Sequence, residues 1–560
     1  MKNLCKLLPY LIFISLPLIN ISCNDDTIIN EGETRAKTID IDEIKFTKGV
    51  NFSGWFLADS VDGILKTLYK KPDFEQAKSL GVDIIRLPIR FYKMTGDAPE
   101  YKIKNDFWEK LDYALNLAEE VGVNIIIDNH SYFGYNTFPK AYGEAQMTKV
   151  WEQVAKHCKD RRLNVYYELM NEPDGQYLKE NWPEIQGRMI KAIRAIDSKH
   201  YIIVSATSTP ALKDLPDYND DKLIYTFHMY DPFLFTHQGA AKTSILNARN
   251  IPFPYDSKSM PECPESITDP SLYTNYSKTS TEEYIKNNLN NWLAFAKEKN
   301  IKLFCGEFGV LMTYANNDQR CSWYKMVREY LEENNIAWTM WDYHSSFGLF
   351  TKGSDERFET DLNFGLVKAL GFTAPRSYSE DFIPDMPFYS DDFYWGMHGV
   401  SSENKTNINF HDTTYPYKGK NSIGWTIEKK WSSMAVEIWP VIDLSKHLNA
   451  GYHLKFDMRT NVGIDNLHIR FIQYQTNSIP WRTTYILTKK DNIRTDNEWF
   501  EVTIPLSSFK EKGTMDGNTW HTPAGLFNWT QINKLEFSTE GNEYASGAKI
   551  AIENIVITGI

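Results

Sequence analysis

The chain has 560 residues, of which 42% are hydrophobic, 24% charged and 14% aromatic, which excludes a disordered or collagen-like protein and predicts about two or three folded domains. It carries 61 basic and 73 acidic residues, for a net charge of −12, and has no block rich in Lys and Arg. A nucleic-acid partner is therefore not expected. The many Tyr and Trp side chains favour partly polar binding surfaces of the kind that sugars contact.

The first 22 residues have the layout of an export signal. Lys2 and Lys6 precede an apolar stretch over residues 7–19, which is short and interrupted by Pro for a membrane-spanning helix. The run ends at Cys23 and resembles a bacterial lipoprotein signal, in which this cysteine is acylated, although Asn20 stands where Leu is usual. The alternatives are an ordinary cleaved signal or a retained segment. With either type of signal we expect an exported protein, and with the first a cell-surface or outer-membrane lipoprotein.

Residues 23–42 are polar and acidic and predict a tether between the signal and the first domain. Beyond Cys23 the chain has only four cysteines, which are Cys158, Cys263, Cys305 and Cys321. They are too few and too scattered for a disulfide scaffold or a zinc site. One structural disulfide among them is allowed, without a defined pair.

Short β-prone runs alternate with helical segments between residues 43 and 372, a pattern typical of a parallel sheet with crossover helices. The runs are Gly49–Phe52, Asp83–Ile89, Asn124–Asp128, Asn164–Leu169, Tyr201–Ser205, Leu223–Phe227, Lys302–Cys305 and Ala337–Met340. Eight runs predict an α/β fold, a closed (β/α)8 TIM barrel. We expect crossover helices over 107–121, ending at Gly122, and over 282–299. The alternative, an open doubly wound sheet, lacks a Gly-rich phosphate turn after its first run.

Reactive residues of such a barrel lie where the strands end, and polar residues recur there. They are His130 after run three, Asn171 and Glu172 after run four, His228 and Tyr230 after run six, Glu307 after run seven and Trp341 after run eight, with Arg86 inside run two. Each alone has a structural interpretation, such as a paired core Arg, a buried His, a packing Trp, a turn-opening Glu or a counter-ion of Arg86. Together they indicate a charged site, because unpaired carboxylates are costly to desolvate.

Two glutamates at one barrel mouth are suited to glycosidic bond cleavage. The chain has no Ser nucleophile elbow, no metal-ligand spacing and no phosphate loop. A separation of about 5–5.5 Å would make one carboxylate the nucleophile and retain configuration, whereas about 6.5–9.5 Å would admit a water and invert it. The ends of strands four and seven should lie nearly opposite each other, so we infer retention.

The motifs Tyr167-Glu168-Leu169-Met170-Asn171-Glu172-Pro173 and Gly306-Glu307-Phe308-Gly309 resemble those of glycoside hydrolase family 5, the cellulase and mannanase family. The resemblance implies that Glu172 is the acid/base and Glu307 the nucleophile. It implies that Asn171 binds a sugar hydroxyl, Arg86 braces the nucleophile and Tyr230 hydrogen-bonds it. His130 and His228 would line the catalytic subsite, and Trp341 would be the sugar platform. The segment 231–281 is too long for a simple connector, so we expect it to wall the cleft and to carry specificity.

After a Pro-rich linker over 373–395, residues 396–560 alternate as strands of an all-β jelly-roll sandwich. The expected strands are Met434–Ile438, Tyr452–Met458, Leu467–Gln473, Phe500–Pro505, Lys534–Phe537 and Ile550–Ile557. The segments Trp499-Phe500-Glu501-Val502-Thr503-Ile504-Pro505-Leu506 and Ile552-Glu553-Asn554-Ile555 loosely resemble carbohydrate-binding family 11. Six tryptophans are candidate sugar platforms, of which we expect one or two to be exposed: Trp425, Trp431, Trp439, Trp481, Trp520 and Trp529. Such modules sometimes hold structural calcium, but no acidic loop here indicates it.

The prediction is a monomeric retaining endo-β-glycanase that acts on β-1,4-linked glucan, without a cofactor or catalytic metal. Its partner is a β-linked polysaccharide or oligosaccharide, and it meets a membrane only through the N-terminal lipid. Mannan, xyloglucan and mixed-linkage glucan are alternative substrates. The competing functions are a non-hydrolytic glycan-binding lipoprotein, against which the two glutamates argue, and a transglycosylase or exo-acting glucosidase on the same barrel.

Overall fold

The computed structural model describes residues 45–131, 139–140, 142–207, 215–375, 382–401, 407–428, 430–473, 479–491, 493–545 and 547–559. The expected signal (1–22), the lipidation site Cys23 and the tether (23–42) lie outside the described residues.

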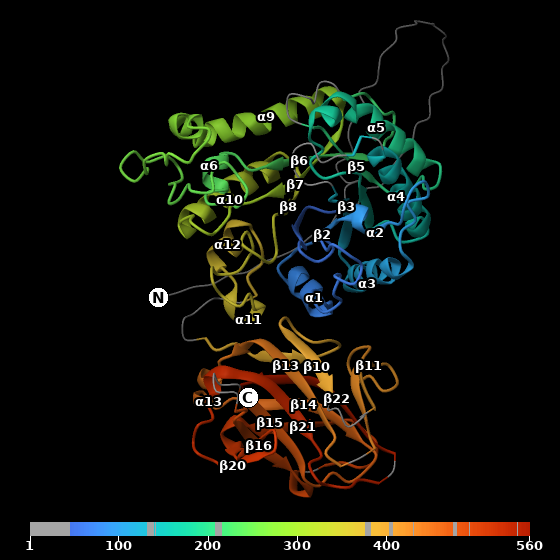
Figure 1. The fold of residues 1–560 in the computed structure, drawn as a ribbon, viewed down its shortest axis with the longest axis vertical. Coiled ribbons are helices and arrows are strands. Elements are labelled where there is room, and N and C mark those ends of the chain that lie inside the picture. The colour runs from blue at the N-terminus through green and yellow to red at the C-terminus, as the bar shows by residue number, and fades with distance from the viewer. Residues whose placement is uncertain are drawn as a thin grey trace, which may run out of the picture. The chain divides into compact units, whose positions relative to one another are not determined.

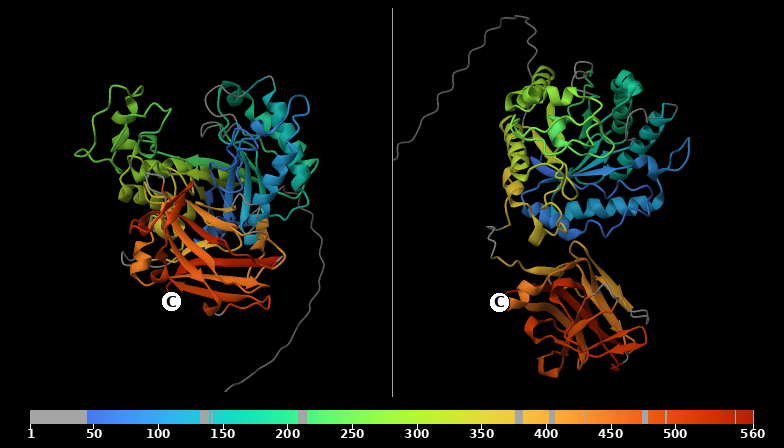
Figure 2. Two further views of the ribbon diagram at one scale, coloured as in Figure 1. Left: turned by 60° about the horizontal axis from the view of Figure 1, so that its bottom comes forward. Right: turned by 60° about the vertical axis from the view of Figure 1, so that its left-hand side comes forward.

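Eight parallel strands form a closed barrel in chain order, with helices around it (Figures 1 and 2). The strands are β1 (Lys48–Asn51), β2 (Ile84–Ile89), β3 (Asn124–Asn129), β4 (Val165–Glu168), β5 (Ile202–Ser205), β6 (Leu223–Met229), β7 (Lys302–Phe308) and β8 (Ala337–Met340). The predicted TIM barrel and its eight runs are thereby confirmed. Strands β6 and β7 extend two or more residues beyond their predicted ends, so that His228 belongs to β6 and Glu307 to β7.

The barrel helices bury one apolar stripe each. In α3 (Asn105–Val121) the stripe runs from Phe107 to Val121, and the helix ends at Gly122, whose φ of 77° suits a residue without a Cβ. In α9 (Glu282–Lys299) the hydroxyl of Thr281 caps the first turn by accepting from the Tyr284 N–H. Both predicted crossover helices are therefore present. The other longer helices are α1 (Lys71–Ser79), α4 (Gly143–Cys158), α5 (Gln176–Arg194) and α10 (Asn317–Glu333).

The segment 231–281 contains three short helices, α6 (Phe233–Thr236), α7 (Ser271–Thr274) and α8 (Tyr276–Thr279). Several of its side chains, among them Phe235 and Ile251, are buried in the hydrophobic core of the barrel domain. The segment is therefore folded onto the barrel and is not a simple connector.

The period of two along each strand decides what points into the barrel. One buried layer is apolar and includes Ile84, Ile126 and Tyr166. Two residues further along the same strands come Arg86, Asp128 and Glu168, which are also buried. The layer toward the C-terminal strand ends is therefore charged, and it forms the base of the site.

Residues beyond 385 form a β-sandwich of antiparallel sheets. One sheet has the order β10 (Met397–Ser401), β13 (Ser433–Ile442), β21 (Ile532–Ser538), β15 (Leu467–Gln473), β16 (Arg482–Leu487) and β18 (Lys510–Glu511). The other has the order β11 (Asn407–Asp412), β12 (Ser422–Ile427), β22 (Ala548–Thr558), β14 (His453–Thr460) and β17 (Phe500–Pro505), and β9 (Met386–Tyr389) pairs with β22. A small third sheet pairs β19 (Thr514–Asp516) with β20 (Thr519–His521).

All six predicted strands of the sandwich are present, and its core lies between the two larger sheets. Strand β9 falls inside the range expected for the linker. Its Pro387 suggested a turn, but a proline is tolerated where a strand lacks a second neighbour, and β9 pairs with β22 alone among the described strands.

Two expectations about the whole chain concern its cysteines and membrane contact. Cys158, Cys263, Cys305 and Cys321 are all free, so the allowed disulfide is not formed among these described cysteines. In the described ranges no helix is both long and apolar enough to cross a membrane.

Candidate active site

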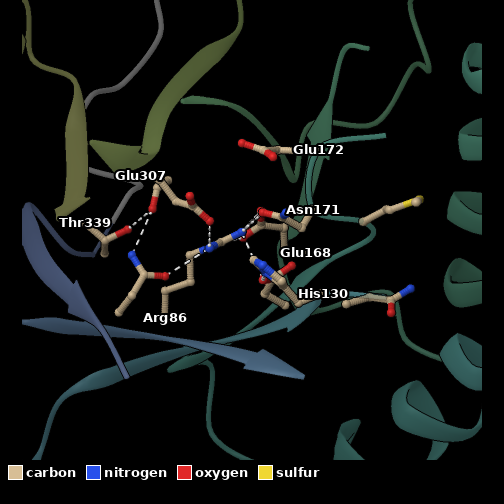
Figure 3. A network of polar contacts seen from close by, with 12 residues as sticks. Arg86, His130, Glu168, Asn171, Glu172, Glu307 and Thr339 are labelled. Carbon is tan, nitrogen blue, oxygen red and sulfur yellow. Dashed lines mark hydrogen bonds and ion pairs between the residues drawn. The ribbon is translucent and has the colours of Figure 1, made fainter. Parts of the chain in front are cut away.

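Glu172 and Glu307 meet at the C-terminal end of the barrel. Glu172 follows β4, and Glu307 is the sixth residue of β7. One carboxylate oxygen of each lies, together with a ring nitrogen of His228, in a group whose atoms are all within 4.8 Å of one another. In Figure 3 Glu307 on β7 and Glu172 on the turn after β4 both lie above the Arg86 side chain. Within the described ranges this is also the one cluster close enough to ligate a metal ion.

The Arg86 guanidinium is the centre of the polar network (Figure 3). It is fully buried and lies 2.7 Å from Oε1 of Glu307, 2.7 Å from Oε2 of Glu168 and 3.0 Å from Oδ2 of Asp128. It also donates to Oδ1 of Asn171 at 2.9 Å. Burial would lower the pKa of Arg86, but the carboxylates, Asp128 first, raise it well above its ordinary value. The planar guanidinium of Arg can donate to several acceptors at once. Arg86 therefore fixes the positions of Glu168 on β4 and Glu307 on β7 relative to each other.

The charge of this network is limited by desolvation. Burial raises the pKa of Asp128 to about 6 and also raises that of Glu168. Burial lowers the pKa of His130 to about 4, so its ring is neutral near pH 7. Its Nδ1 lies 2.7 Å from Oδ2 of Asp128, and a neutral ring with its proton on Nδ1 donates this hydrogen bond.

Glu307 is held from two sides. Arg86 donates to Oε1 and the Tyr230 hydroxyl donates to Oε2, both at 2.7 Å. Burial raises the pKa of Tyr230 well above its ordinary value, so the hydroxyl remains a donor at all physiological pH values. The Glu307 side chain is only 6% exposed, and these two contacts hold both of its oxygens in place, as a positioned nucleophile requires.

Glu172 is paired with His228, whose Nδ1 lies 2.7 Å from Oε1 of Glu172 and 3.5 Å from Oε2 of Glu307. The Glu172 side chain is 58% exposed. Burial would raise the pKa of Glu172, but the hydrogen bond from His228 and the charge of the His228 ring lower that pKa to about 2. Burial would lower the pKa of His228, but Glu307 and Glu172 raise it. Without substrate, the proton of this pair is thus on the imidazole.

Two groups of stacked aromatic side chains belong to the site. The half-buried Trp341 lies nearly parallel to His130, with ring centroids 5.6 Å apart. Tyr230, which hydrogen-bonds to Glu307, contacts His237 edge-on at 4.8 Å, and Phe233 stacks on His237 at 4.5 Å. His237 and Phe233 belong to the segment 231–281, which was expected to wall the cleft.

The Asp342 carboxyl supports the loop that carries Trp341. It is fully buried and hydrogen-bonds to the hydroxyls of Ser53 and Ser345. Burial raises its pKa to about 8, despite both hydrogen bonds. At neutral pH this carboxyl is therefore protonated and can donate as well as accept.

The barrel brings together all eight residues selected from the sequence. Those residues are Arg86, His130, Asn171, Glu172, His228, Tyr230, Glu307 and Trp341. Asn51, Asp128 and Glu168 also contact Arg86 and were not among the predicted site residues. Asn51 accepts from Arg86 and donates to the Gly306 carbonyl. Alternate residues of a strand point into the barrel, and this rule predicts that Asp128 and Glu168 point inward as Arg86 does. Nothing in the sequence distinguishes Asn51.

A closed (β/α)8 barrel with two facing carboxylates at its C-terminal end defines the class of barrel glycosidases. Residues 47–346 match the family model described as Cellulase (glycosyl hydrolase family 5). This match covers more than half of the chain, so the chain belongs to glycosyl hydrolase family 5, as its motifs predicted.

Individual relatives are more distant. The chain is 28% identical over 385 residues to Endoglucanase 3 of Fibrobacter succinogenes, an alignment covering 64% of this chain and 56% of that protein. It is 27% identical over 319 residues to Endoglucanase C of Acetivibrio thermocellus, covering 54% and 92% respectively. The structure of endoglucanase Cel5A from Thermotoga maritima is 25% identical, with a TM-score of 0.48, covering 58% of this chain and 96% of that one.

Residues 385–559 match the model of carbohydrate binding domain 30. The predicted C-terminal carbohydrate-binding module is thereby confirmed, but its assignment to family 11 was wrong. That assignment rested on residues 499–506 and 552–555, which fall largely in strands β17 and β22.

The expectation of one or two exposed tryptophans in the module was too low. Trp431, Trp439 and Trp520 are 55%, 75% and 50% exposed, whereas Trp425 and Trp481 are buried and Trp529 is partly buried against the core. The exposed three lie in or beside β13 and β20, where the strands present one face to solvent.

Proposed function

We propose that the barrel is a retaining endo-β-glycanase that cleaves β-1,4-linked glucan. The observation that carries this proposal is the approach of a Glu172 oxygen to a Glu307 oxygen within 4.8 Å. That separation suits direct attack on a sugar carbon and leaves no room for the water that inversion needs between carboxyl groups about 6.5–9.5 Å apart.

In the first step a Glu307 oxygen bonds to the anomeric carbon as the bond to the leaving-group oxygen breaks, and Glu172 gives that oxygen its proton. In the second step a water attacks the same carbon, Glu172 takes the water's proton, and the bond to Glu307 breaks. The sugar is released with its original configuration. Arg86 and Tyr230 hold Glu307 in place for attack, because each donates to a different oxygen.

The remaining residues bind the sugar in this proposal. Asn171 accepts from Arg86 through Oδ1, so its amide N–H groups remain to bind the hydroxyl next to the anomeric carbon. Trp341 offers its face to the apolar side of the pyranose, and His130 and His228 line the same subsite.

The test is reducing-sugar release from soluble β-1,4-glucan by the wild type and by Glu307→Gln. We expect release by the wild type, a mixture of internal chain lengths early in the reaction, and no release by the variant. Release of single sugars or dimers alone would indicate an exo-acting enzyme, and equal activity of both proteins would refute the role of Glu307. Parallel assays on mannan, xyloglucan and mixed-linkage glucan test the substrate, and no release from any of them would favour a binding protein.

We infer that the sandwich presents its glycan platform on the outer face of the sheet that contains β13, β15, β16 and β21. Trp431 donates through its backbone N–H to the Glu540 carbonyl, and the Glu540 carboxylate lies 3.9 Å from Arg482. Arg482 in turn lies over the Trp520 ring at 5.9 Å. Two exposed indole rings lie on one face, with charged groups between them. A sugar chain could stack on the two rings and form hydrogen bonds with the charged groups between them.

We also propose that the protein is exported and acylated at Cys23. The support is the basic and apolar pattern of residues 1–22 and the position of the cysteine. Metabolic labelling with a fatty acid should mark the wild type and not Cys23→Ser. An unlabelled wild type found free in the medium would indicate an ordinary cleaved signal.

A further inference from the structure

The sandwich has a polar hollow on its other sheet, away from the tryptophans proposed as glycan platforms. It lies over β11, β12, β22 and β14, three of which are labelled in Figure 1, and has a volume of about 360 Å³. That volume is in the range of roughly 300–1,000 Å³ found for small-molecule sites. Neither the proposed hydrolysis nor the proposed platform uses this hollow.

The floor of the hollow consists of small side chains. Ile423 and Trp425 of β12 point into the sandwich core, so the alternating Gly424 and Thr426 face outward. Gly424 pairs directly with Ala551 of β22, which also lines the hollow. Gly424 and Ala551 are thus neighbours that face outward with very small side chains, and this creates the depression.

One wall requires the glycine. A Cβ on residue 424 would lie 2.2 Å from Oδ2 of Asp412, so the Asp412 side chain occupies the space over β12 that any other residue would fill. Asp412 also accepts from the Thr414 N–H at 2.9 Å, which fixes its direction. The wall is therefore built from a residue pair, and it is not a chance feature of a flexible loop.

The opposite wall presents a positioned cation. The Arg459 guanidinium lies 4.1 Å from the centre of the Tyr415 ring, and its Nε donates to Oδ1 of Asn497 at 3.0 Å. Its two terminal nitrogens have no hydrogen-bond or ion-pair partner among the described residues. The Tyr415 ring and the Asn497 amide fix the direction of the guanidinium. Its two terminal nitrogens can then donate to both oxygens of a carboxylate.

The other lining groups suit a sugar. Lys549 adds a second cation, so the lining carries two positive charges against one negative charge, in a chain whose net charge is −12. Asn409 and Asn497 supply amide groups, which bind hydroxyls as donors and acceptors.

We infer that this hollow is a second saccharide site of the sandwich and that its ligand is an oligosaccharide bearing a carboxylate, that is, a uronic acid residue. The carboxylate pairs with Arg459, with Lys549 adding to the attraction, and the sugar hydroxyls meet the asparagines. The inference goes beyond the proposed function, because it depends neither on hydrolysis nor on Trp431 and Trp520.

The experiment is calorimetric titration of the full chain carrying Glu307→Gln, which prevents hydrolysis of the probes, with glucuronic acid-substituted xylo-oligosaccharides and with oligogalacturonates. Unsubstituted xylo-oligosaccharides and cello-oligosaccharides of equal length are the neutral probes. We expect at least one acidic probe to bind ten-fold or more tightly than its neutral counterpart, and added salt to weaken that binding. Arg459→Gln should reduce the acidic affinity at least ten-fold.

Thr426→Met fills the floor without changing charge and should also abolish acidic binding, which separates loss of the site from loss of a surface charge. Arg494→Gln removes an exposed arginine that pairs with Asp496 and lies outside the hollow, and it should change nothing. Thermal unfolding verifies that each variant is folded. Equal affinity for acidic and neutral probes, or acidic binding that survives both Arg459→Gln and Thr426→Met, would overturn the inference. Loss of neutral-glucan binding in Arg459→Gln would instead make the hollow a neutral site and overturn the assignment of the ligand.

Discussion

Nδ1 of His228 lies 2.7 Å from Oε1 of Glu172 and 3.5 Å from Oε2 of Glu307, so one imidazole contacts both carboxylates. This contact lowers the pKa of Glu172 to about 2 and raises that of His228. An acid with so low a pKa could not donate a proton near pH 7 if it acted alone. The pair, however, still holds one proton, and the two groups titrate as a unit. Substrate that separates them would return the proton to Glu172.

His228→Asn should therefore move the alkaline limb of the kcat/KM profile to lower pH. In the wild type the imidazole, with its raised pKa, retains the proton of the pair above pH 6.5, the ordinary value for His. In the variant only Glu172 holds the proton, and a carboxyl loses it sooner even if burial raises its pKa. We expect a shift of about one pH unit or more. His237→Asn is the control, because burial already lowers the pKa of His237 to about 4 and its ring carries no proton to lose in this range. An alkaline limb unchanged by His228→Asn would mean that the pair does not hold the catalytic proton.

Glu172→Ala should damage turnover least for substrates with good leaving groups. A leaving group that is stable as an anion needs little protonation, whereas a sugar hydroxyl needs nearly a full proton. Rates on aryl β-glycosides should therefore fall much less than rates on glucan, and they should depend more steeply on leaving-group pKa than wild-type rates do. Glu307→Ala, in contrast, should lose about 10⁴-fold or more on every substrate. If Glu172→Ala slowed all leaving groups equally, its role as acid would be wrong.

Arg86→Ala should cost stability chiefly at neutral pH. Arg86 neutralises Asp128, Glu168 and Glu307, and removing it leaves three buried carboxyls without their cation, a loss of about 3–5 kcal/mol. Burial already raises the pKa values of Asp128 and Glu168 in the folded protein, and without Arg86 they rise further above their unfolded values. The destabilisation then grows with increasing pH and diminishes in acid, where the carboxyls are protonated.

The control for that experiment is Arg320→Ala, which removes an equally buried arginine. Arg320 donates to the carbonyls of Val310, Phe347 and Gly348 and has no carboxylate partner among the described residues. Its loss should lower the melting temperature by a similar amount at pH 5 and pH 8. A pH-independent loss in Arg86→Ala as well would show that the network is not held by charge.

The barrel and most of its site were predictable because buried parallel strands appear as continuous apolar runs, and polar residues follow directly after them. Apolar runs of the right length identified all eight strands, and polar residues at their ends lie at one rim because parallel strands share a direction. The contact between His228 and Glu172 was not predictable, since it depends on side-chain directions from β6 and from the turn after β4. The low pKa of Glu172 follows from that contact and was equally hidden.

The sandwich was harder to predict where its strands lack a strong pattern. β11 alternates only between exposed and half-buried residues, because it is an edge strand, so the hydrophobic pattern that identified β14 and β22 is weak there. The tryptophans show a second limit. Trp425 is buried and Trp431 exposed although they are six residues apart, because Trp425 points between the sheets and Trp431 follows the end of β12.

Trp431→Ala and Trp520→Ala should each weaken binding of cello-oligosaccharides to the sandwich about ten-fold. Each removes an exposed aromatic face on the same side of the sheet, and such contacts are worth roughly 1 kcal/mol beyond buried area. Activity on soluble glucan should persist, and adsorption to insoluble cellulose should fall. Trp439→Ala is the matched control, because Trp439 is more exposed but lies further along the chain, inside β13, whereas Trp431 lies in the turn before that strand. Equal loss of oligosaccharide binding in all three variants would argue against a single platform.

Asp342→Asn should stabilise the protein at pH 8 relative to pH 5. The folded-state pKa of Asp342 is about 8, well above the ordinary 3.8, so between these values the folded protein binds one more proton than the unfolded chain. Wild-type stability therefore falls as pH rises through this window, by up to about 1.4 kcal/mol per unit from this group. The asparagine does not titrate and removes that slope, so the difference in melting temperature, variant minus wild type, should increase with pH. Asp197→Asn is the control. Burial alone would raise the pKa of Asp197, but hydrogen bonds from the Lys199 and His200 backbone and from Tyr167 lower it. The Asp197 carboxyl is therefore ionised in both the folded and the unfolded state above pH 5. Its substitution should shift the melting temperature equally at pH 5 and pH 8, and a flat response in Asp342→Asn as well would show that the Asp342 carboxyl is ionised in the folded protein.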